Sequence, residues 1–183
     1  MPVVQVYTDG SAYPQLSRYS NSFCAWAWVI PKKDGIHYLK DSGIATGKNT
    51  TGEILAVVNA LRFISQRIGT GLEVQVFCDY CAVSSALNGN LDKWKANNWR
   101  KKHPSRTTHA HGRLMLSDEA EWRLLDAEVG KFQDVVGINL ASHSGDKWND
   151  KVDKVAGSTL RHEANRRIRD GIISESMIFS KSY

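Results

Sequence analysis

The chain has 183 residues, a length that favours a single domain spanning residues 1–183. Hydrophobic residues make up 42% and charged residues 23%, as in ordinary soluble globular proteins, and the net charge of +5 favours an anionic partner only modestly. The three cysteines argue against a disulfide framework, and the sequence shows neither a signal peptide nor an apolar run long enough to span a membrane. We therefore expect a cytoplasmic protein with no membrane partner.

The first half of the chain predicts three strands followed by a long helix. Apolar runs that end at turn residues or at a proline indicate strands, which we place at residues 3–8, 23–30 and 36–45. The pattern then changes, because the next apolar residues recur at intervals of three and four. That period predicts an amphipathic helix over residues 51–68.

The second half alternates strands with helices. Its predicted elements are a strand at 73–78, a short helix at 80–88, a helix at 118–132, a strand at 136–142 and a final helix at about 148–169. This order predicts an α/β domain whose mixed five-stranded sheet is flanked by helices. The pattern assigns no structure to residues 170–183.

A basic segment at residues 93–113 has neither an apolar face nor a clean period, so we interpret it as a helix and loop that project from the domain. No Asp or Glu occurs between Lys93 and Ser117. Trp94 and Trp99 alternate there with cations, an arrangement typical of surfaces that bind phosphates and stack on sugars or bases. The alternative is a solvated surface loop.

Four acidic residues fall at the ends of predicted strands or near the starts of predicted helices: Asp9, Asp79, Glu53 and Asp153. Strand ends and helix starts at one edge of an α/β sheet lie close together. Clustered carboxylates repel one another unless divalent cations bind them, and magnesium prefers oxygen ligands. Two such ions about 3.5–4 Å apart can activate a water and stabilise the leaving oxygen in phosphodiester cleavage.

Each carboxylate also has an explanation without chemistry. Asp9 precedes a glycine, as in a turn, and Asp79 could cap the short helix that follows it. Glu53 lies three residues after Thr50 and could complete a capping box. Asp153 could belong to a solvated helix face. The catalytic interpretation therefore depends on the four residues occurring together in this order.

The ordered motifs resemble those of type 1 ribonuclease H. The similarity spans roughly residues 3–157. Its motifs are Val6-Tyr7-Thr8-Asp9-Gly10-Ser11, Asn49-Thr50-Thr51-Gly52-Glu53-Ile54, Phe77-Cys78-Asp79-Tyr80, His143-Ser144-Gly145, and the later Asn149, Asp153 and Ala156. The resemblance implies a ribonuclease H-like fold with a core at about 3–157 and a helical C-terminal extension at 158–183. The motifs do not explain that extension, whose cations would add a second basic face: Arg161, Arg166, Arg167 and Arg169.

The resemblance implies hydrolysis of the RNA strand of RNA–DNA hybrids, leaving 5′-phosphate and 3′-hydroxyl ends. It implies four ligands for two Mg²⁺ ions, with Mn²⁺ as a plausible substitute: Asp9, Glu53, Asp79 and Asp153. Asp150 and, more weakly, Asp146 compete for the last place. His143 is implied to transfer protons and to help product release, tasks that suit a side chain titrating near neutral pH.

The resemblance also implies a nucleic-acid surface on a protein that we expect to be a monomer. Ser11, Asn49 and Thr50 are candidates for the contacts that distinguish RNA from DNA at the 2′-hydroxyl. The basic segment resembles the basic protrusion of the family and contributes Trp94, Lys95, Trp99, Lys101 and Lys102. We expect Trp122, by contrast, in the core.

Two other functions stay open. A DNA-processing nuclease or recombinase of the same fold, as in integrase and resolvase relatives, is disfavoured by the full order of four carboxylates and His143. A non-catalytic module that binds hybrids is disfavoured because a pure binder gains nothing by placing carboxylates against phosphates.

Overall fold

The computed structural model describes residues 2–19, 22–101, 114–141 and 145–179. Five strands form its central sheet: β1 (Val3–Ala12), β2 (Phe23–Pro31), β3 (Tyr38–Thr46), β4 (Glu73–Cys78) and β7 (Asp134–Asn139). The order across the sheet is β3-β2-β1-β4-β7, with the first three strands antiparallel and the last three parallel. The predicted mixed five-stranded sheet is confirmed.

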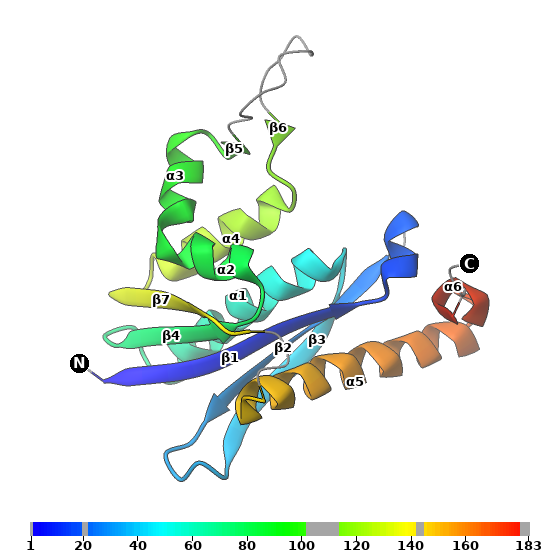
Figure 1. Ribbon diagram of the computed structural model, residues 1–183, viewed down its shortest axis with the longest axis horizontal. Coiled ribbons are helices and arrows are strands. Elements are labelled where there is room, and N and C mark those ends of the chain that lie inside the picture. The colour runs from blue at the N-terminus through cyan, green and yellow to red at the C-terminus, as the bar shows by residue number, and fades with distance from the viewer. Residues whose placement is uncertain (1, 20–21, 102–113, 142–144, 180–183) are drawn as a thin grey trace.

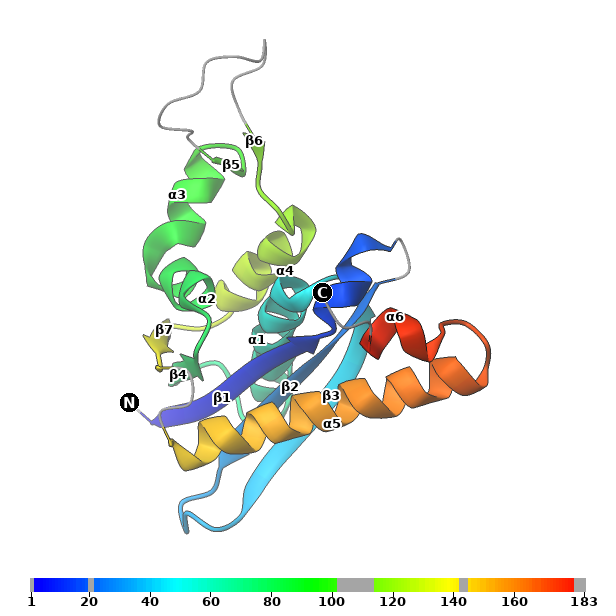
Figure 2. The ribbon, with the colours of Figure 1, turned by 45° about the vertical axis from the view of Figure 1, so that its right-hand side comes forward.

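Helices cover both faces of this sheet, as Figures 1 and 2 show. They are α1 (Asn49–Arg67), α2 (Cys81–Ser85), α3 (Leu91–Ala96), α4 (Glu119–Val129), α5 (Lys147–Arg169) and α6 (Glu175–Phe179). α1 packs on one face and carries α4 on its outer side, while α5 crosses the other face against β1, β2 and β3. Within the described residues, no helix is both long and apolar enough to cross a membrane.

β1 is the central strand and extends past its parallel neighbour. Its pairing with β4 ends where Tyr7 lies opposite Phe77, whereas its pairing with β2 continues to Ala12. We predicted that the strand would end before Asp9 in a turn, and this is wrong. Asp9 pairs with Ala27 inside the β1–β2 ladder, so the strand places the carboxylate beside the end of β4.

The start of α1 lies directly against β1 and β2 because two glycines permit backbone contact. A Cβ atom on Gly10 would lie 2.3 Å from the Glu53 nitrogen, and one on Gly52 would lie 2.5 Å from the Ala25 carbonyl oxygen. No side chain fits in either place. This close approach holds Glu53 beside β1, while the buried face of α1 packs into the main hydrophobic core.

The other face of the sheet is covered by α5, whose start is fixed by a side-chain cap. The Asp146 carboxylate accepts hydrogen bonds from the backbone N–H groups of Trp148 and Asn149, each at 2.9 Å. Val152 and Ala156 then pack against the sheet in a second buried cluster. The cap and this packing set the position of the exposed Asp153 along the helix.

The segment between β4 and α4 departs from the single short helix predicted at 80–88. Three helical stretches follow one another, α2, η2 (Ala86–Asn90) and α3, and the chain bends at Gly89, whose φ is +108°. A two-residue ladder then joins β5 (Arg100–Lys101) to β6 (Leu114–Met115). The basic segment thus begins as a helix, as predicted.

The C-terminal extension folds back onto the domain. Beyond α5, the chain turns and forms α6, which contacts the short 3₁₀ helix η1 (Pro14–Arg18) that follows β1, as Figure 2 shows. Ile173 and Ile178 are buried there in one cluster with Leu16, Phe23 and Leu160. Residues 170–179, to which the sequence pattern assigned no structure, therefore support the loop at the end of β1.

Candidate active site

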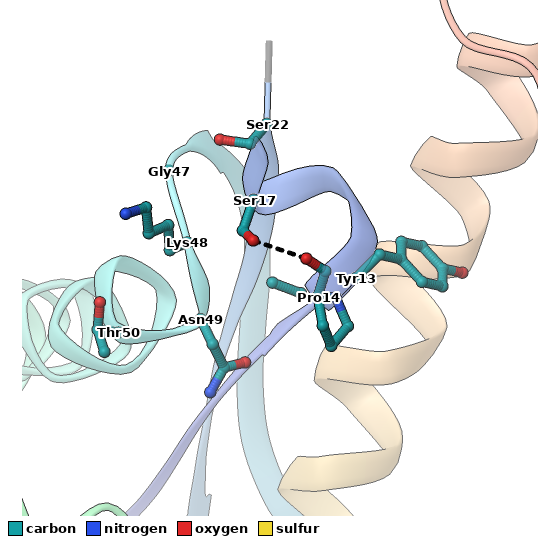
Figure 3. Close-up of a pocket in the computed structure, with 9 residues that line it drawn as sticks. Tyr13, Pro14, Ser17, Ser22, Gly47, Lys48, Asn49 and Thr50 are labelled. Carbon is teal, nitrogen blue, oxygen red and sulfur yellow. Dashed lines mark hydrogen bonds between the residues drawn. The ribbon is translucent and has the colours of Figure 1, made fainter. Parts of the chain in front are cut away.

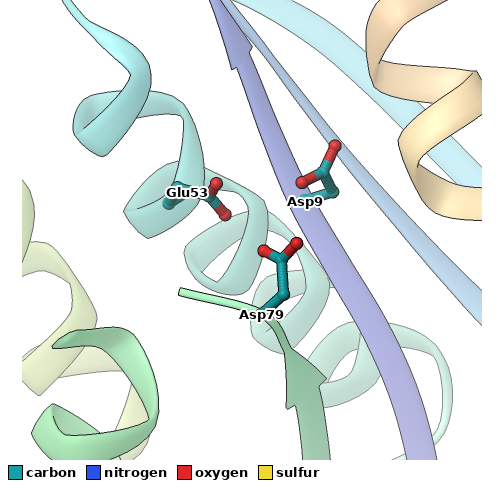
Figure 4. Close-up of side chains that lie close together, drawn as sticks. All are labelled: Asp9, Glu53 and Asp79. Atoms are coloured by element: carbon teal, nitrogen blue, oxygen red, sulfur yellow. The ribbon is translucent and has the colours of Figure 1, made fainter. Parts of the chain in front are cut away.

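Three carboxylates from different elements meet beside the end of β4. Asp9 comes from β1, Glu53 from α1, and Asp79 directly follows β4, as Figure 4 shows. One oxygen from each lies within 4.8 Å of the others. The parallel register explains why the two aspartates lie close together. Tyr7 and Phe77 form the last pair of the β1–β4 ladder, and Asp9 and Asp79 each follow two residues later, so they lie opposite one another.

Burial makes this cluster electrostatically costly. Asp9 is 8% exposed and Glu53 is 4% exposed. Burial, together with the nearby charges of Asp79 and Asp153, raises the pKa of Asp9 to about 7. Burial and the charges of Asp9 and Asp79 likewise raise the pKa of Glu53 well above its usual value. The free protein therefore opposes full ionisation of the cluster at neutral pH.

Two oxygens of the cluster have no protein partner in the described part of the chain. They are Asp9 Oδ2 and Glu53 Oε2, both buried. Glu53 Oε1, by contrast, accepts a hydrogen bond of 3.3 Å from the Asn49 side-chain amide. Buried polar atoms normally have partners, so orphaned carboxylate oxygens in such a cluster indicate a site for a divalent cation. The residues present fit such an ion.

Asp153 stands at the border of the cluster. It lies exposed on α5, nearly two turns in rather than the single turn predicted, and its charge acts on Asp9. Asp146, a weaker competitor for the same place, is already engaged as the cap of α5. Asp150 is partly buried in the first turn of that helix. The geometry therefore favours Asp153 over Asp146.

Two local explanations for the acidic residues do not hold. Glu53 takes no part in a capping box with Thr50, because Lys48 precedes the helix and donates its backbone N–H to the Thr51 hydroxyl at 3.1 Å. Asp79 does not cap α2 either, since Tyr80 occupies that position and no side chain caps it. Both carboxylates are left to face Asp9.

A hollow of about 420 Å³ lies beside the cluster, between the start of α1 and the loop after β1. Asn49 and Thr50, which we proposed from the sequence, line it together with Lys48 and Pro14, as Figure 3 shows. Sequence reasoning missed Lys48, although its position directly before Asn49 was a signal. Ser11 lies on the other side of the loop, in a second hollow against α5.

The position of Trp99 does not support its predicted stacking role, whereas that of Trp94 stays a prediction. Trp99 is only 4% exposed and belongs to the core, with the Arg123 guanidinium 4.8 Å from its ring centroid. Trp94 is partly buried, with its ring centroid 5.0 Å from that of the buried Trp122. These rings anchor the basic segment to α4, and this packing is the physical reason why Trp99 offers no free face.

The cations of the basic segment are only partly described. Lys95 is exposed and forms an ion pair of 2.8 Å with Asp126. His143 and Lys102 lie outside the described residues, and so does the side chain of Lys101. The interpretation of these three residues stays a prediction.

Sequence comparison with known proteins gives a consistent family. The chain matches the family described as RNase H over residues 1–161. A relative named Ribonuclease H, from Syntrophomonas wolfei, is 25% identical over 163 residues, covering 88% of this chain and 98% of the relative.

Two solved structures show the same fold. LC9-RNase H1, described as a type 1 RNase H with the type 2 active-site motif, aligns with a TM-score of 0.66 at 17% identity, covering 88% of this chain and 74% of that chain. A foamy viral protease-reverse transcriptase in complex with RNA/DNA hybrid aligns with a TM-score of 0.63 at 17% identity, over 86% of this chain and 20% of that one.

Proposed function

Because the chain belongs to the RNase H family, we propose that it hydrolyses the RNA strand of RNA–DNA hybrids and leaves 5′-phosphate and 3′-hydroxyl ends. The observation that carries this proposal is the cluster of the buried Asp9 and Glu53 with the partly buried Asp79 at the end of β4. Carboxylates with raised pKa values and orphaned oxygens destabilise the folded protein. Such strongly shifted groups are typical of functional sites, and a metal-dependent reaction at phosphate requires carboxylates placed in this way.

The proposed metal ligands are Asp9, Glu53, Asp79 and Asp153, which would hold two Mg²⁺ ions or two Mn²⁺ ions in their place. When bound, the ions would supply an activated water and charge stabilisation for the leaving oxygen. Asp9 and Glu53 would supply buried oxygens, and the exposed Asp153 would add a carboxylate from α5. Asn49 orients Glu53 through its amide hydrogen bond.

Recognition of RNA is proposed for the residues around the two hollows. Ser11, Asn49 and Thr50 offer hydroxyl and amide groups of the kind that bind a 2′-hydroxyl. Lys48 adds a cation at the rim, where a phosphate of either strand would bind. The relative orientation of these groups is maintained in part by Asp118, which accepts a hydrogen bond from the Thr50 hydroxyl at 2.9 Å.

The basic segment is proposed to contact the backbone of the hybrid through Lys95, Lys101 and Lys102. Trp99 supports this segment from within, whereas the partly buried Trp94 is proposed to contact a sugar or base. His143 is proposed to transfer protons and to promote product release. A cytoplasmic location, a monomeric state and a single domain over residues 1–183 stay predictions.

The decisive experiment measures cleavage of a labelled RNA–DNA hybrid with and without Mg²⁺, beside DNA duplex, RNA duplex and single-stranded RNA. Metal-dependent cutting of the hybrid's RNA strand alone is expected. Asp9→Asn should abolish it, whereas the control Asp134→Asn, an exposed carboxylate at the far end of β7, should cut at the wild-type rate.

The alternatives predict different results. A DNA-processing enzyme would cut duplex DNA that contains no RNA. A hybrid-binding module would bind the hybrid tightly without any metal-dependent turnover. If folded wild-type protein cuts no hybrid, the proposed function is wrong and the family fold alone stands.

A further inference from the structure

A second hollow of about 330 Å³ lies between the end of β1 and the middle of α5. Ser11, Ala12 and Tyr13 form one wall, and Gly157, Leu160, Arg161 and Asn165 form the other. Figure 3 shows the Tyr13 ring directed toward α5 and away from Asn49 and Thr50. Tyr13 therefore separates this hollow from the one at the start of α1.

The hollow lies on the same faces of β1 and α5 as two of the proposed metal ligands. Along β1, Asp9 and Ser11 are two residues apart and so point to the same face of the strand. Along α5, Asp153, Gly157 and Arg161 follow one another at intervals of four and so share one face of the helix. The eight residues from Asp153 to Arg161 span about 12 Å along α5, and this length corresponds to roughly three to four base-pair steps of a duplex.

Gly157 provides the room that Arg161 occupies. A Cβ atom on Gly157 would lie 3.3 Å from Arg161 Nη1, so the guanidinium lies back along the helix toward Asp153. Glycine inside a helix is less favourable than alanine, so its presence in α5 calls for a local reason. At this position the missing side chain leaves the floor of the hollow open and lets the guanidinium line it.

Arg161 differs from Arg166 and Arg167, two of the three arginines that follow it on α5. Arg166 and Arg167 both bond to Glu163, each through a contact of 2.7 Å. Arg161 forms no ion pair with any described residue, and its side chain is exposed at the hollow. Burial raises the pKa of the Tyr13 hydroxyl, and the nearby charge of Arg161 offsets part of that rise. The guanidinium is thus available to an external anion.

We propose that Arg161 binds a phosphate of the strand that occupies the carboxylate cluster, a few nucleotides from the bond that is cut. This inference rests on the proposed function and extends its substrate site along the β1–α5 groove. A guanidinium presents paired donors that match phosphate oxygens, and the Ser11 hydroxyl and the Asn165 amide lie in the same hollow as further donors. The C-terminal half of α5, which the family motifs leave unexplained, thereby gains a role in substrate binding.

The first test compares Arg161→Ala with the control Arg169→Ala, which removes the same charge from an exposed position two turns further along α5. Arg161→Ala should raise KM for the hybrid on the order of three- to tenfold with kcat nearly unchanged. Binding measured in EDTA should lose about one unit from the slope of log Kd against log salt. The control should retain the wild-type KM and slope.

The second test locates the phosphate. Single neutral methylphosphonates are placed one at a time along the RNA strand, and Kd is measured for wild type and for Arg161→Ala. At one position the methylphosphonate should weaken binding to wild type but not to Arg161→Ala, because the variant has already lost the contact between the guanidinium and that phosphate. Arg161→Lys should restore part of the affinity and restore the sensitivity at that same position.

Two results would overturn the inference. One is that Arg161→Ala binds and cleaves the hybrid like wild type. The other is that Arg161→Ala and the methylphosphonates have additive effects on Kd at every position. A variant that merely perturbs α5 would behave in this way. In either case wild-type cleavage of the hybrid would leave the proposed function intact, whereas failure of wild type to cut any hybrid would overturn both.

Discussion

Tyr7 stacks on Phe77 with ring centroids 4.7 Å apart and an angle of 12° between the rings. The two residues are also the last pair in the parallel ladder of β1 and β4. The stack therefore fixes the register at the point where β4 ends, two residues before Asp9 and Asp79. A slip of one residue would turn every side chain to the opposite face and separate the carboxylates.

Gly10→Ala should disrupt the site through the backbone. The new Cβ atom would lie 2.3 Å from the Glu53 nitrogen, so the start of α1 must move away from β1. We expect the free energy of unfolding to fall by roughly 2–4 kcal/mol and the cleavage rate to fall sharply. Urea unfolding followed by circular dichroism measures the first effect, and hybrid cleavage measures the second.

Gly71→Ala is the matched control, because nothing lies within 4 Å of its Cβ position. It should change the free energy of unfolding by about 0.5 kcal/mol or less and leave cleavage unchanged. Equal effects of the two substitutions would show that the close approach at Gly10 does not position Glu53.

Asp118 should contribute to stability by joining the starts of two helices. Its carboxylate accepts hydrogen bonds from the hydroxyls of Thr50, Thr51 and Ser117, while its own φ is +58°. We expect Asp118→Ala to lower the free energy of unfolding by about 2–3 kcal/mol. Asp118→Gly should cost less, since glycine adopts a positive φ without strain.

Urea unfolding of the two Asp118 variants, beside Asp134→Ala as a surface control, tests both contributions. If the glycine variant is no more stable than the alanine variant, the backbone at Asp118 is not strained. If neither variant is less stable than wild type, the three hydrogen bonds contribute nothing net.

The sequence predicted the elements better than the connections between them. Residues 73–78 matched β4, and the helix expected at 51–68 is α1 at Asn49–Arg67, because strong hydrophobic periods are set by burial. The turn expected at Asp9 was wrong, since pairing with β2 overrides the local preference of an Asp-Gly pair. Asp-Gly carries no signal that distinguishes these outcomes.

The candidate site was predicted as a set of residues but not as a surface. Three of the four carboxylates cluster, because their positions follow from the ends of elements that the sequence reveals. The burial of Trp99 could not be predicted, because the sequence around a tryptophan among cations is the same whether its ring faces solvent or packs against α4. The hollow beside Arg161 depends on contact between β1 and α5, far apart in sequence, and no local pattern encodes it.

Ile178→Ala should loosen the loop that borders both hollows. Ile178 is 3% exposed and lies in one cluster with Leu16 of η1. Its truncation should lower the free energy of unfolding by about 2–3 kcal/mol and raise KM for the hybrid more than it lowers kcat. Ile172→Ala, at a residue of the same C-terminal extension that is 50% exposed, should leave both nearly unchanged. A KM equal to that of wild type in Ile178→Ala would show that α6 does not support η1 during binding.

Without metal, Asp9 should make the protein less stable as the pH rises from about 4 to about 7. The carboxyl of Asp9 has a pKa raised from 3.8 to about 7 by burial first and by neighbouring carboxylates second. Between these values the folded state keeps a proton that the unfolded chain has lost, so raising the pH favours unfolding, by up to about 1.4 kcal/mol per pH unit. Above pH 7 both states are ionised, and the penalty is constant.

Urea unfolding of wild type and Asp9→Asn in EDTA at pH 5, 6, 7 and 8 tests this expectation. Asparagine does not ionise, so the variant should gain stability relative to wild type up to about pH 7, and the difference should then level off. Saturating Mg²⁺ should reduce the difference at pH 8, because a cation that binds only the folded state stabilises wild type more. A difference that does not vary with pH would show that Asp9 ionises in the folded protein as it does in water.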